Sequence, residues 1–216
     1  MLQERFTVYA IARRGRGETD ATVGHTLEDE VRDVAAVIRA IGEPVFLLGH
    51  SYGALCSLAA SALAPASIRK LVLYEAPWPS VLSREALMSL EELAAAGAWD
   101  DFAFTFFRDT LHVPVGELEQ LRASELWPPI VADAKASLGD LRGLVRYGFD
   151  AERFAGLDLP VLLQIGSESP RDLYITDALA AVLPDSRIEA LSGQAHEGMT
   201  TTPEMYADAV IRFLLA

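Results

Sequence analysis

Apolar residues along the chain fall into short runs that end at glycine, proline or polar clusters. The runs cover residues 6–12, 45–48, 68–74, 161–165 and 187–191. Runs this short and this apolar are typical of strands that are buried on both faces of a sheet. The pattern therefore predicts five strands.

Amphipathic helices are expected between these strands. Apolar residues recur at helical spacing from Leu27 to Ile41, behind Thr26, whose hydroxyl can cap the first turn. A helix is expected over residues 54–63, and the last helix is expected to begin at Thr202 and Pro203. Strands that alternate with helices favour an α/β fold, a mostly parallel sheet covered on both faces in three α/β/α layers.

The pattern changes between residues 78 and 154, where helices follow one another and no strand is convincing. We interpret residues 78–154 as a helical cap inserted into a core formed by residues 1–77 and 155–216. The cap is rich in large aromatic residues. These aromatics either line a pocket for an apolar substrate or only hold the insertion together.

The composition narrows the class of protein. The chain has 216 residues, of which 51% are hydrophobic and 23% charged, which is typical of a soluble globular protein. Its net charge of −13, without a basic block, argues against nucleic acid or an anionic membrane as a partner. We find no membrane-spanning segment and no signal peptide, and the single Cys56 suits a reducing compartment. A cytoplasmic location is therefore expected.

The segment Gly49-His50-Ser51-Tyr52-Gly53 carries the clearest chemical signal. A predicted strand precedes it and a predicted helix follows it. A serine at such a turn is held in a strained backbone conformation, and we expect the two glycines to keep Cβ atoms out of the crowded corner. The hydroxyl is then exposed at the carboxyl edge of the sheet, so Ser51 is a candidate nucleophile.

A serine hydroxyl needs a base, and the base needs a group that orients it. Of the four histidines, His25 precedes a helix and His112 lies in the insertion, and both are interpreted as ordinary polar residues. The side chain of His50 is expected to point away from the hydroxyl of Ser51. His196 lies in a loop between the last strand and the last helix, which would place it at the same edge. His196 is therefore the candidate general base.

The orienting acid is less well defined. The usual place is the loop after residues 161–165, but that loop has Ser169 where an aspartate is expected, with Glu168 and Asp172 nearby. The alternative is Glu75, at the end of an apolar strand, where a buried carboxylate needs a partner such as an imidazolium. We rank Glu75 first and keep Glu168 and Asp172 as alternatives.

Together these residues resemble the α/β-hydrolase superfamily, from Phe6 to the C-terminus. Residues 13–19 look like the loop after the fourth strand of that fold, and residues 49–53 look like its nucleophile elbow. The chain has Ser169 at the usual position of the acid. In this it is similar to members of the superfamily whose acid has moved to the end of the sixth strand, which supports Glu75.

The resemblance implies a serine hydrolase, of esterase type, that acts on a small-molecule ester, thioester or other acyl substrate. It implies the backbone N–H of Tyr52 as a donor to the oxyanion, and neither a metal nor an organic cofactor. No group of Cys, His and Asp with the spacing of metal ligands is found in the sequence.

The N-terminus departs from the superfamily pattern, in which further strands come first and a loop after the third strand supplies a second oxyanion donor. The chain is therefore expected to be N-terminally shortened, as a fragment of a longer hydrolase or as a minimal form. A minimal form would be a catalytically impaired binding or interaction protein. Residues 6–12 then either pair with residues 45–48 or leave an exposed sheet edge, which invites self-association into a homo-oligomer.

Overall fold

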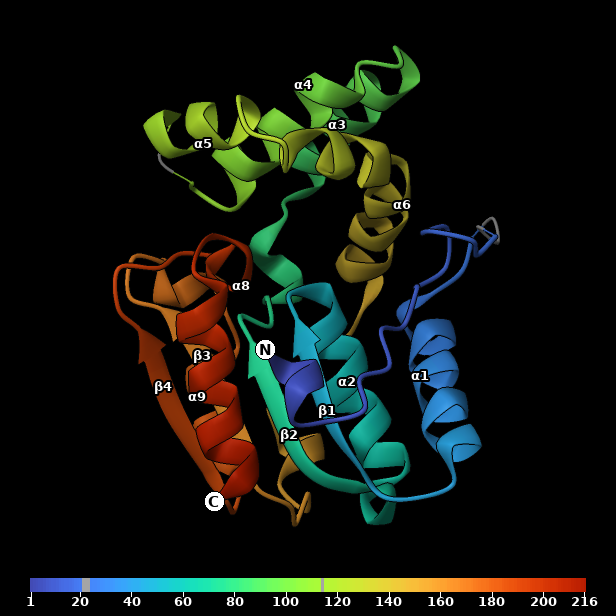
Figure 1. Cartoon of the computed structure of the whole chain (residues 1–216). Coiled ribbons are helices and arrows are strands. Elements are labelled where there is room, and N and C mark those ends of the chain that lie inside the picture. The colour runs from blue at the N-terminus through green and yellow to red at the C-terminus, as the bar shows by residue number, and fades with distance from the viewer. Residues whose placement is uncertain (21–23, 114) are drawn as a thin grey trace. The chain divides into compact units, whose positions relative to one another are not determined.

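A computed structural model describes residues 1–20, 24–113 and 115–216 of the chain (Figure 1). Four strands form one parallel sheet in the order β1-β2-β3-β4. The strands are β1 (Val45–His50), β2 (Ile68–Tyr74), β3 (Val161–Gly166) and β4 (Ser186–Leu191). The predicted α/β fold with a parallel sheet is confirmed.

The register aligns the carboxyl ends of the four strands. His50 pairs with Tyr74, Tyr74 with Gln164, and Gly166 with Leu191. Because all strands run in the same direction, the residues that follow them lie along one edge of the sheet. That edge is the place at which open parallel sheets bind ligands.

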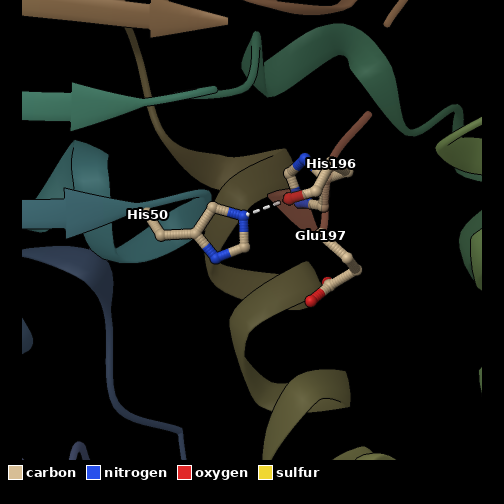
Figure 2. A group of neighbouring side chains, drawn as sticks. All are labelled: His50, His196 and Glu197. Atoms are coloured by element: carbon tan, nitrogen blue, oxygen red, sulfur yellow. Dashed lines mark hydrogen bonds between the residues drawn. The ribbon is translucent and has the colours of Figure 1, made fainter. Parts of the chain in front are cut away.

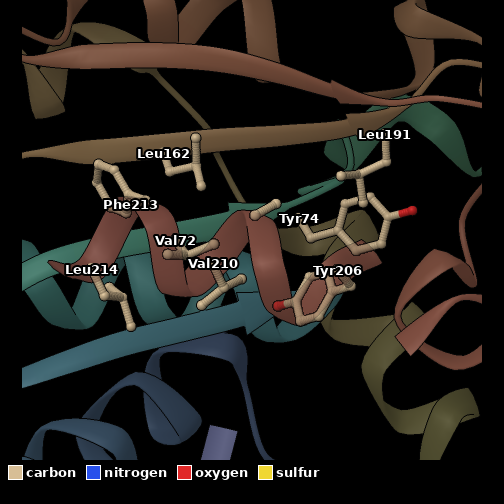
Figure 3. Close-up of a cluster of buried hydrophobic side chains, with 9 residues drawn as sticks. Val72, Tyr74, Leu162, Leu191, Tyr206, Val210, Phe213 and Leu214 are labelled. Atoms are coloured by element: carbon tan, nitrogen blue, oxygen red, sulfur yellow. The ribbon is translucent and has the colours of Figure 1, made fainter. Parts of the chain in front are cut away.

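One face of the sheet is covered by α9 (Pro203–Leu215). Its apolar side chains pack against those of β2, β3 and β4 (Figure 3). The buried residues of this cluster are Val72, Tyr74, Leu162, Leu191, Tyr206, Ala209, Val210, Phe213 and Leu214. The helix starts where the sequence predicts. The hydroxyl of Thr202, however, donates to the carbonyl of Gly198 at 3.0 Å and does not cap the helix.

The other face is covered by α2 (Tyr52–Leu63), which packs against β1 and β2. Small buried residues of α2, among them Ala54, Cys56 and Ala60, allow its backbone to approach the strands closely. The first predicted helix is confirmed as α1 (Leu27–Ile41). Between β3 and β4, α7 (Thr176–Val182) packs against both strands.

The prediction of a strand over residues 6–12 is wrong. Val8 and Tyr9 are 53% and 61% exposed, and the segment has no strand conformation. A strand is stable only beside another strand, and β1 is an edge strand whose open side pairs with none of the described residues. Only Phe6 is packed, edge-on against Phe46 with ring centroids 5.7 Å apart. Of the two expected outcomes, the structure therefore shows the open edge.

The chain divides into two compact units. Residues 1–11, 28–78 and 149–216 form the first, and residues 12–27 and 79–148 form the second. The second unit therefore includes residues 12–27, which precede the region expected to form the cap. Its longer helices are α3 (Arg84–Ala95), α4 (Trp99–Thr105), the π-helix η4 (Phe106–Thr110), α5 (Val115–Arg122) and α6 (Trp127–Arg146).

The second unit has its own core and its own ion-pair network. Phe102, Phe107 and Trp127 are buried in apolar clusters within it, so these aromatics hold the unit together. Arg13 donates two hydrogen bonds to the Asp140 carboxylate, at 3.0 and 2.6 Å, and Arg16 adds a third at 2.8 Å. This network ties residues 13–16 to α6.

The remaining elements are short. They are the 3₁₀ turns η1 (Leu2–Glu4), η2 (Pro65–Ser67), η3 (Pro79–Val81), η5 (Ala151–Phe154) and η6 (Arg171–Leu173), and the single-turn helix α8 (Gly198–Thr201). None of the described helices combines the length and the apolar character that crossing a bilayer requires.

Candidate active site

The predicted site residues lie at the carboxyl edge of the sheet. Ser51 directly follows β1, Glu75 directly follows β2, and His196 lies in the loop after β4. The N–H of Ser51 donates to the carbonyl of Tyr74 at 2.9 Å, and the N–H of Glu75 donates to the carbonyl of Gln164 at 3.1 Å. Both residues are thus held by the neighbouring strand at the point where the chain leaves the sheet.

Ser51 has a strained backbone, as the sequence predicts. Its φ of 52° and ψ of −128° lie in a region that residues with a Cβ rarely adopt. A Cβ at position 49 would lie 2.6 Å from the Cα of Ala54 and 2.7 Å from the Oγ of Ser57, so Gly49 is required. A Cβ at position 53 would meet nothing within 4 Å, so the steric role expected for Gly53 is wrong. Gly53 already belongs to the first turn of α2, where it is clear of the corner.

A buried hydrogen bond joins His196 to Glu75. The Nδ1 of His196 lies 2.7 Å from the Oε2 of Glu75, and the two residues are 4% and 0% exposed. The N–H of Gly166, at the end of β3, donates to the other carboxylate oxygen at 2.7 Å. A carboxylate can only accept, so Nδ1 of His196 carries the proton and Nε2 presents a lone pair.

The same contacts keep Glu75 ionised. Burial by itself raises the pKa of this carboxyl group, but the hydrogen bond and charge of His196 lower it, and hydrogen bonds from Ser169 and Gly166 lower it further. The net shift of the pKa is downward. Glu75 is therefore a carboxylate at neutral pH and can stabilise a positive charge on His196.

Tyr174 is a further partner of this pair. Its hydroxyl lies 3.2 Å from the Nδ1 of His196, and the two rings stack at an angle of 10° with centroids 5.8 Å apart. An antiparallel bridge to Pro77 holds the backbone of Tyr174 in place. Burial raises the pKa of the phenol far above its usual value, and the charge of Glu75 raises it further, so the hydroxyl stays neutral.

His50 holds the loop that carries His196. Its Nε2–H donates to the backbone carbonyl of His196 at 2.8 Å, and the ring centroids of the two histidines are 4.6 Å apart. The hydroxyl of Tyr74 donates to the carbonyl of Ala195. Burial lowers the pKa of His50 to about 4, with a further contribution from His196, so His50 is neutral at pH 7.

In the described part of the chain, neither of the other candidate acids forms a hydrogen bond or ion pair with His196. Glu168 and Asp172 are exposed, and the carboxylate of Glu168 accepts a hydrogen bond from the hydroxyl of Ser167 at 2.9 Å. Within the described part of the chain, no hydrogen bond joins the hydroxyl of Ser51 to His196. Such bonds are often long before substrate binds. His25 and His112 belong to the second unit.

The sequence model of the alpha/beta hydrolase family matches residues 1–209. The chain belongs to the alpha/beta hydrolase family. None of the curated proteins matches the sequence.

Solved structures agree with this family. An alpha/beta hydrolase from Sphaerobacter thermophilus is 29% identical, with a TM-score of 0.79 over 94% of this chain and 79% of the other. An enol-lactonase from Burkholderia xenovorans is 18% identical, with a TM-score of 0.77 and coverage of 94% and 79%. An esterase from Exiguobacterium antarcticum is 16% identical, with a TM-score of 0.70 and coverage of 94% and 80%.

Sequence analysis missed three residues of this alpha/beta hydrolase that shape the site. A Cβ at Gly166 would lie 2.2 Å from the carbonyl oxygen of Gln194, and a Cβ at Gly198 would lie 2.5 Å from the hydroxyl of Tyr74. A glycine that ends an apolar run could have drawn attention to Gly166. Nothing in the sequence singles out Tyr174, because its role depends on contacts with distant residues.

Proposed function

We propose that the chain is a serine hydrolase that cleaves an ester, thioester or related acyl bond of a small molecule. Ser51 is the nucleophile, His196 the general base and Glu75 the group that orients His196. The buried hydrogen bond between His196 and Glu75 is the observation that carries this proposal. A histidine held in one tautomer by a buried carboxylate, at the sheet edge where a strained serine lies, is the arrangement that activates a hydroxyl.

The first step forms an acyl-enzyme. The Oγ of Ser51 attacks the acyl carbon while Nε2 of His196 takes the hydroxyl proton. Glu75 stabilises the resulting imidazolium through Nδ1. The carbonyl oxygen becomes an oxyanion, to which the N–H of Tyr52 donates. Tyr52 is the first residue of α2, where the helix dipole favours negative charge.

The second step releases the acid. The tetrahedral intermediate collapses, and the leaving alcohol or thiol takes the proton from His196. Water then attacks the acyl-enzyme with His196 again acting as base, and Ser51 recovers its proton. Because His50 and Tyr74 hold the backbone at positions 195 and 196, the base keeps its place through both steps.

The test is hydrolysis of short p-nitrophenyl esters by the wild type and by Ser51→Ala. We expect the variant to lose turnover by at least about a thousandfold, because no other group replaces the nucleophile. Ser192→Ala is the matched control, since Ser192 is an exposed serine in the loop before His196. Equal turnover by the wild type and Ser51→Ala would contradict the assignment.

A second candidate is a binding protein that retains these residues without catalysis. It is favoured by the open edge of β1, which pairs with none of the described residues and leaves backbone groups for a partner. Labelling with a fluorophosphonate separates the two, because only an activated serine reacts. We expect labelling of the wild type and none of Ser51→Ala. An unlabelled, inactive wild type would favour the binding protein.

A further inference from the structure

Three potential metal ligands come together around His196, the proposed base of the triad. His50, His196 and Glu197 each offer one ligand atom, and these atoms lie within 4.8 Å of one another (Figure 2). His50 ends β1, and the other two residues lie in the loop after β4. Two imidazole nitrogens and a carboxylate oxygen form a donor set that zinc takes in proteins. Sequence spacing could not show this group, because His50 and His196 are 146 positions apart.

Both imidazoles already donate one ring N–H to a fixed acceptor, as metal-binding histidines usually do. His50 donates its Nε2–H to the backbone carbonyl of His196, as the dashed line in Figure 2 shows. His196 donates its Nδ1–H to Glu75. A histidine that binds a metal commonly donates its other N–H to a carbonyl or a carboxylate in this way. The nitrogen that remains on each ring, Nδ1 of His50 and Nε2 of His196, carries a lone pair.

The third ligand is the adjustable one. In a tetrahedral zinc site with bonds of about 2.0–2.1 Å, ligand atoms lie roughly 3.4 Å apart, so the group must contract by at most about 1.4 Å. Glu197 is only half-buried, and its side chain accepts one long hydrogen bond, from Thr200 at 3.3 Å. Rotation of the Glu197 side chain can therefore bring its carboxylate oxygen closer to the two histidines, and any contraction between the two imidazole nitrogens requires small movements of the rings themselves.

We propose that His50, His196 and Glu197 bind Zn²⁺ or a similar divalent transition-metal ion, and that the bound ion inhibits the hydrolase. The metal takes the lone pair on Nε2 of His196, so this nitrogen can no longer accept the proton of Ser51. Removal of the metal restores the base. The inhibition rests on the proposed function, whereas the metal binding does not.

Binding is tested by titrating the metal-free full chain with Zn²⁺ in a calorimeter. We expect Glu197→Gln to weaken binding by at least about tenfold, the usual loss when a metal site loses a supporting group. Glu204→Gln, the same substitution on the exposed side of α9, is the matched control and is expected to bind like the wild type. Equal affinity in the wild type and Glu197→Gln, or no binding by the wild type, would overturn the site.

Cobalt(II) provides an independent measurement. Co²⁺ in a tetrahedral site with nitrogen ligands absorbs visible light much more strongly than hydrated Co²⁺. We expect this absorption from the wild type, its loss in His50→Gln and its displacement by Zn²⁺. A spectrum identical to that of hydrated Co²⁺ would count against the site.

Inhibition is tested with the ester assay and with fluorophosphonate labelling. Zn²⁺ is expected to suppress both in the wild type, a chelator to restore both, and Glu197→Gln to require at least about tenfold more Zn²⁺. Ser51→Ala is expected to bind Zn²⁺ like the wild type although it is inactive. Binding that depends on Glu197 in a chain without hydrolase activity would uphold the site and reject the proposed function. Binding without inhibition would overturn the regulatory role.

Discussion

Ser51 and Glu75 both have a positive φ angle. Their φ angles are 52° and 48°, although neither is glycine. A residue held in such a region costs of the order of 1–3 kcal/mol and persists only where its surroundings fix it. Here the hydrogen bonds from both N–H groups to the neighbouring strands fix it. The strained residues are thus the two whose side chains have proposed roles at the carboxyl edge of the sheet.

Glu75→Gln tests which carboxylate supports His196. The amide can no longer hold Nδ1–H as a carboxylate does, so the tautomer and charge of His196 change. We expect ester turnover to fall by about 10³–10⁴-fold, by analogy with the loss of the acid in a serine-protease triad. Glu168→Gln and Asp172→Asn remove exposed carboxylates of the alternative loop and should leave kcat unchanged. A larger loss of turnover in either control than in Glu75→Gln would show that the orienting acid lies in that loop.

Two glycines of the site are expected to respond to alanine in opposite ways. In Gly166→Ala the new Cβ would meet the carbonyl of Gln194 at 2.2 Å, so we expect the free energy of unfolding to fall by about 1–3 kcal/mol. In Gly53→Ala the Cβ meets nothing within 4 Å, and the helix gains up to about 1 kcal/mol. Urea denaturation measures both. Equal changes in the free energy of unfolding in the two variants would show that the backbone around Gly166 moves to make room for the new Cβ.

Among the elements, those whose contacts are local could be predicted from the sequence. The apolar run into β1 and the turn at Ser51 predicted a helix after the turn, although α2 begins at Tyr52, two residues before the expected start. The helical spacing predicted both ends of α1. Residues 6–12 have equally apolar character but no partner strand, so the same pattern failed there. Ser51, Glu75 and His196 could be proposed because each follows an apolar run. Tyr174 could not be proposed in this way, because its role depends on contacts with His196, 22 positions away, and with Pro77, 97 positions away. The grouping of His50 with Glu197 spans more than a hundred positions.

A side-chain hydrogen bond caps the N-terminus of α3. The hydroxyl of Ser83 accepts a hydrogen bond from the N–H of Ala86 at 3.1 Å. We expect Ser83→Ala to lower the free energy of unfolding by about 1 kcal/mol, because an exposed N-cap is lost. Ser80→Ala, at a nearby exposed serine, is the control and should be neutral. The two variants are compared by urea denaturation, and a neutral Ser83→Ala would show that water replaces the cap.

At the scale of the whole molecule, acid is expected to weaken the fold. The pKa of His50 falls from 6.5 to about 4 on folding. Between these two pH values the unfolded chain binds a proton that the folded chain does not, so the free energy of unfolding rises with pH. The stability that neutral His50 contributes is therefore lost as the pH falls from about 6.5 towards 4. The lowered pKa of Glu75 also makes the fold less stable in acid. This effect occurs at lower pH, because the stability that the ionised carboxylate contributes is lost as the pH falls through the pKa of Glu75 in the folded protein.

The contribution of His50 is measured by urea denaturation at several pH values between 7 and 4.5. At 1.36 kcal/mol for each pKa unit, His50 accounts for at most about 3 kcal/mol of the loss. We expect His50→Gln to show a smaller fall in stability over this window than the wild type. Parallel curves for the two proteins would show that the protonation of His50 is not coupled to folding.

The order of the strands in the sheet is also their order along the chain. The chain emerges from the ribosome with its N-terminus first. Ser51 can therefore take its place beside β2, and Glu75 beside β3, before His196 has been synthesised. We expect a nascent chain that has not yet reached residue 196 to carry Ser51 without the base that the proposed function requires. The protein thus gains its proposed chemistry only after residue 196 has been translated.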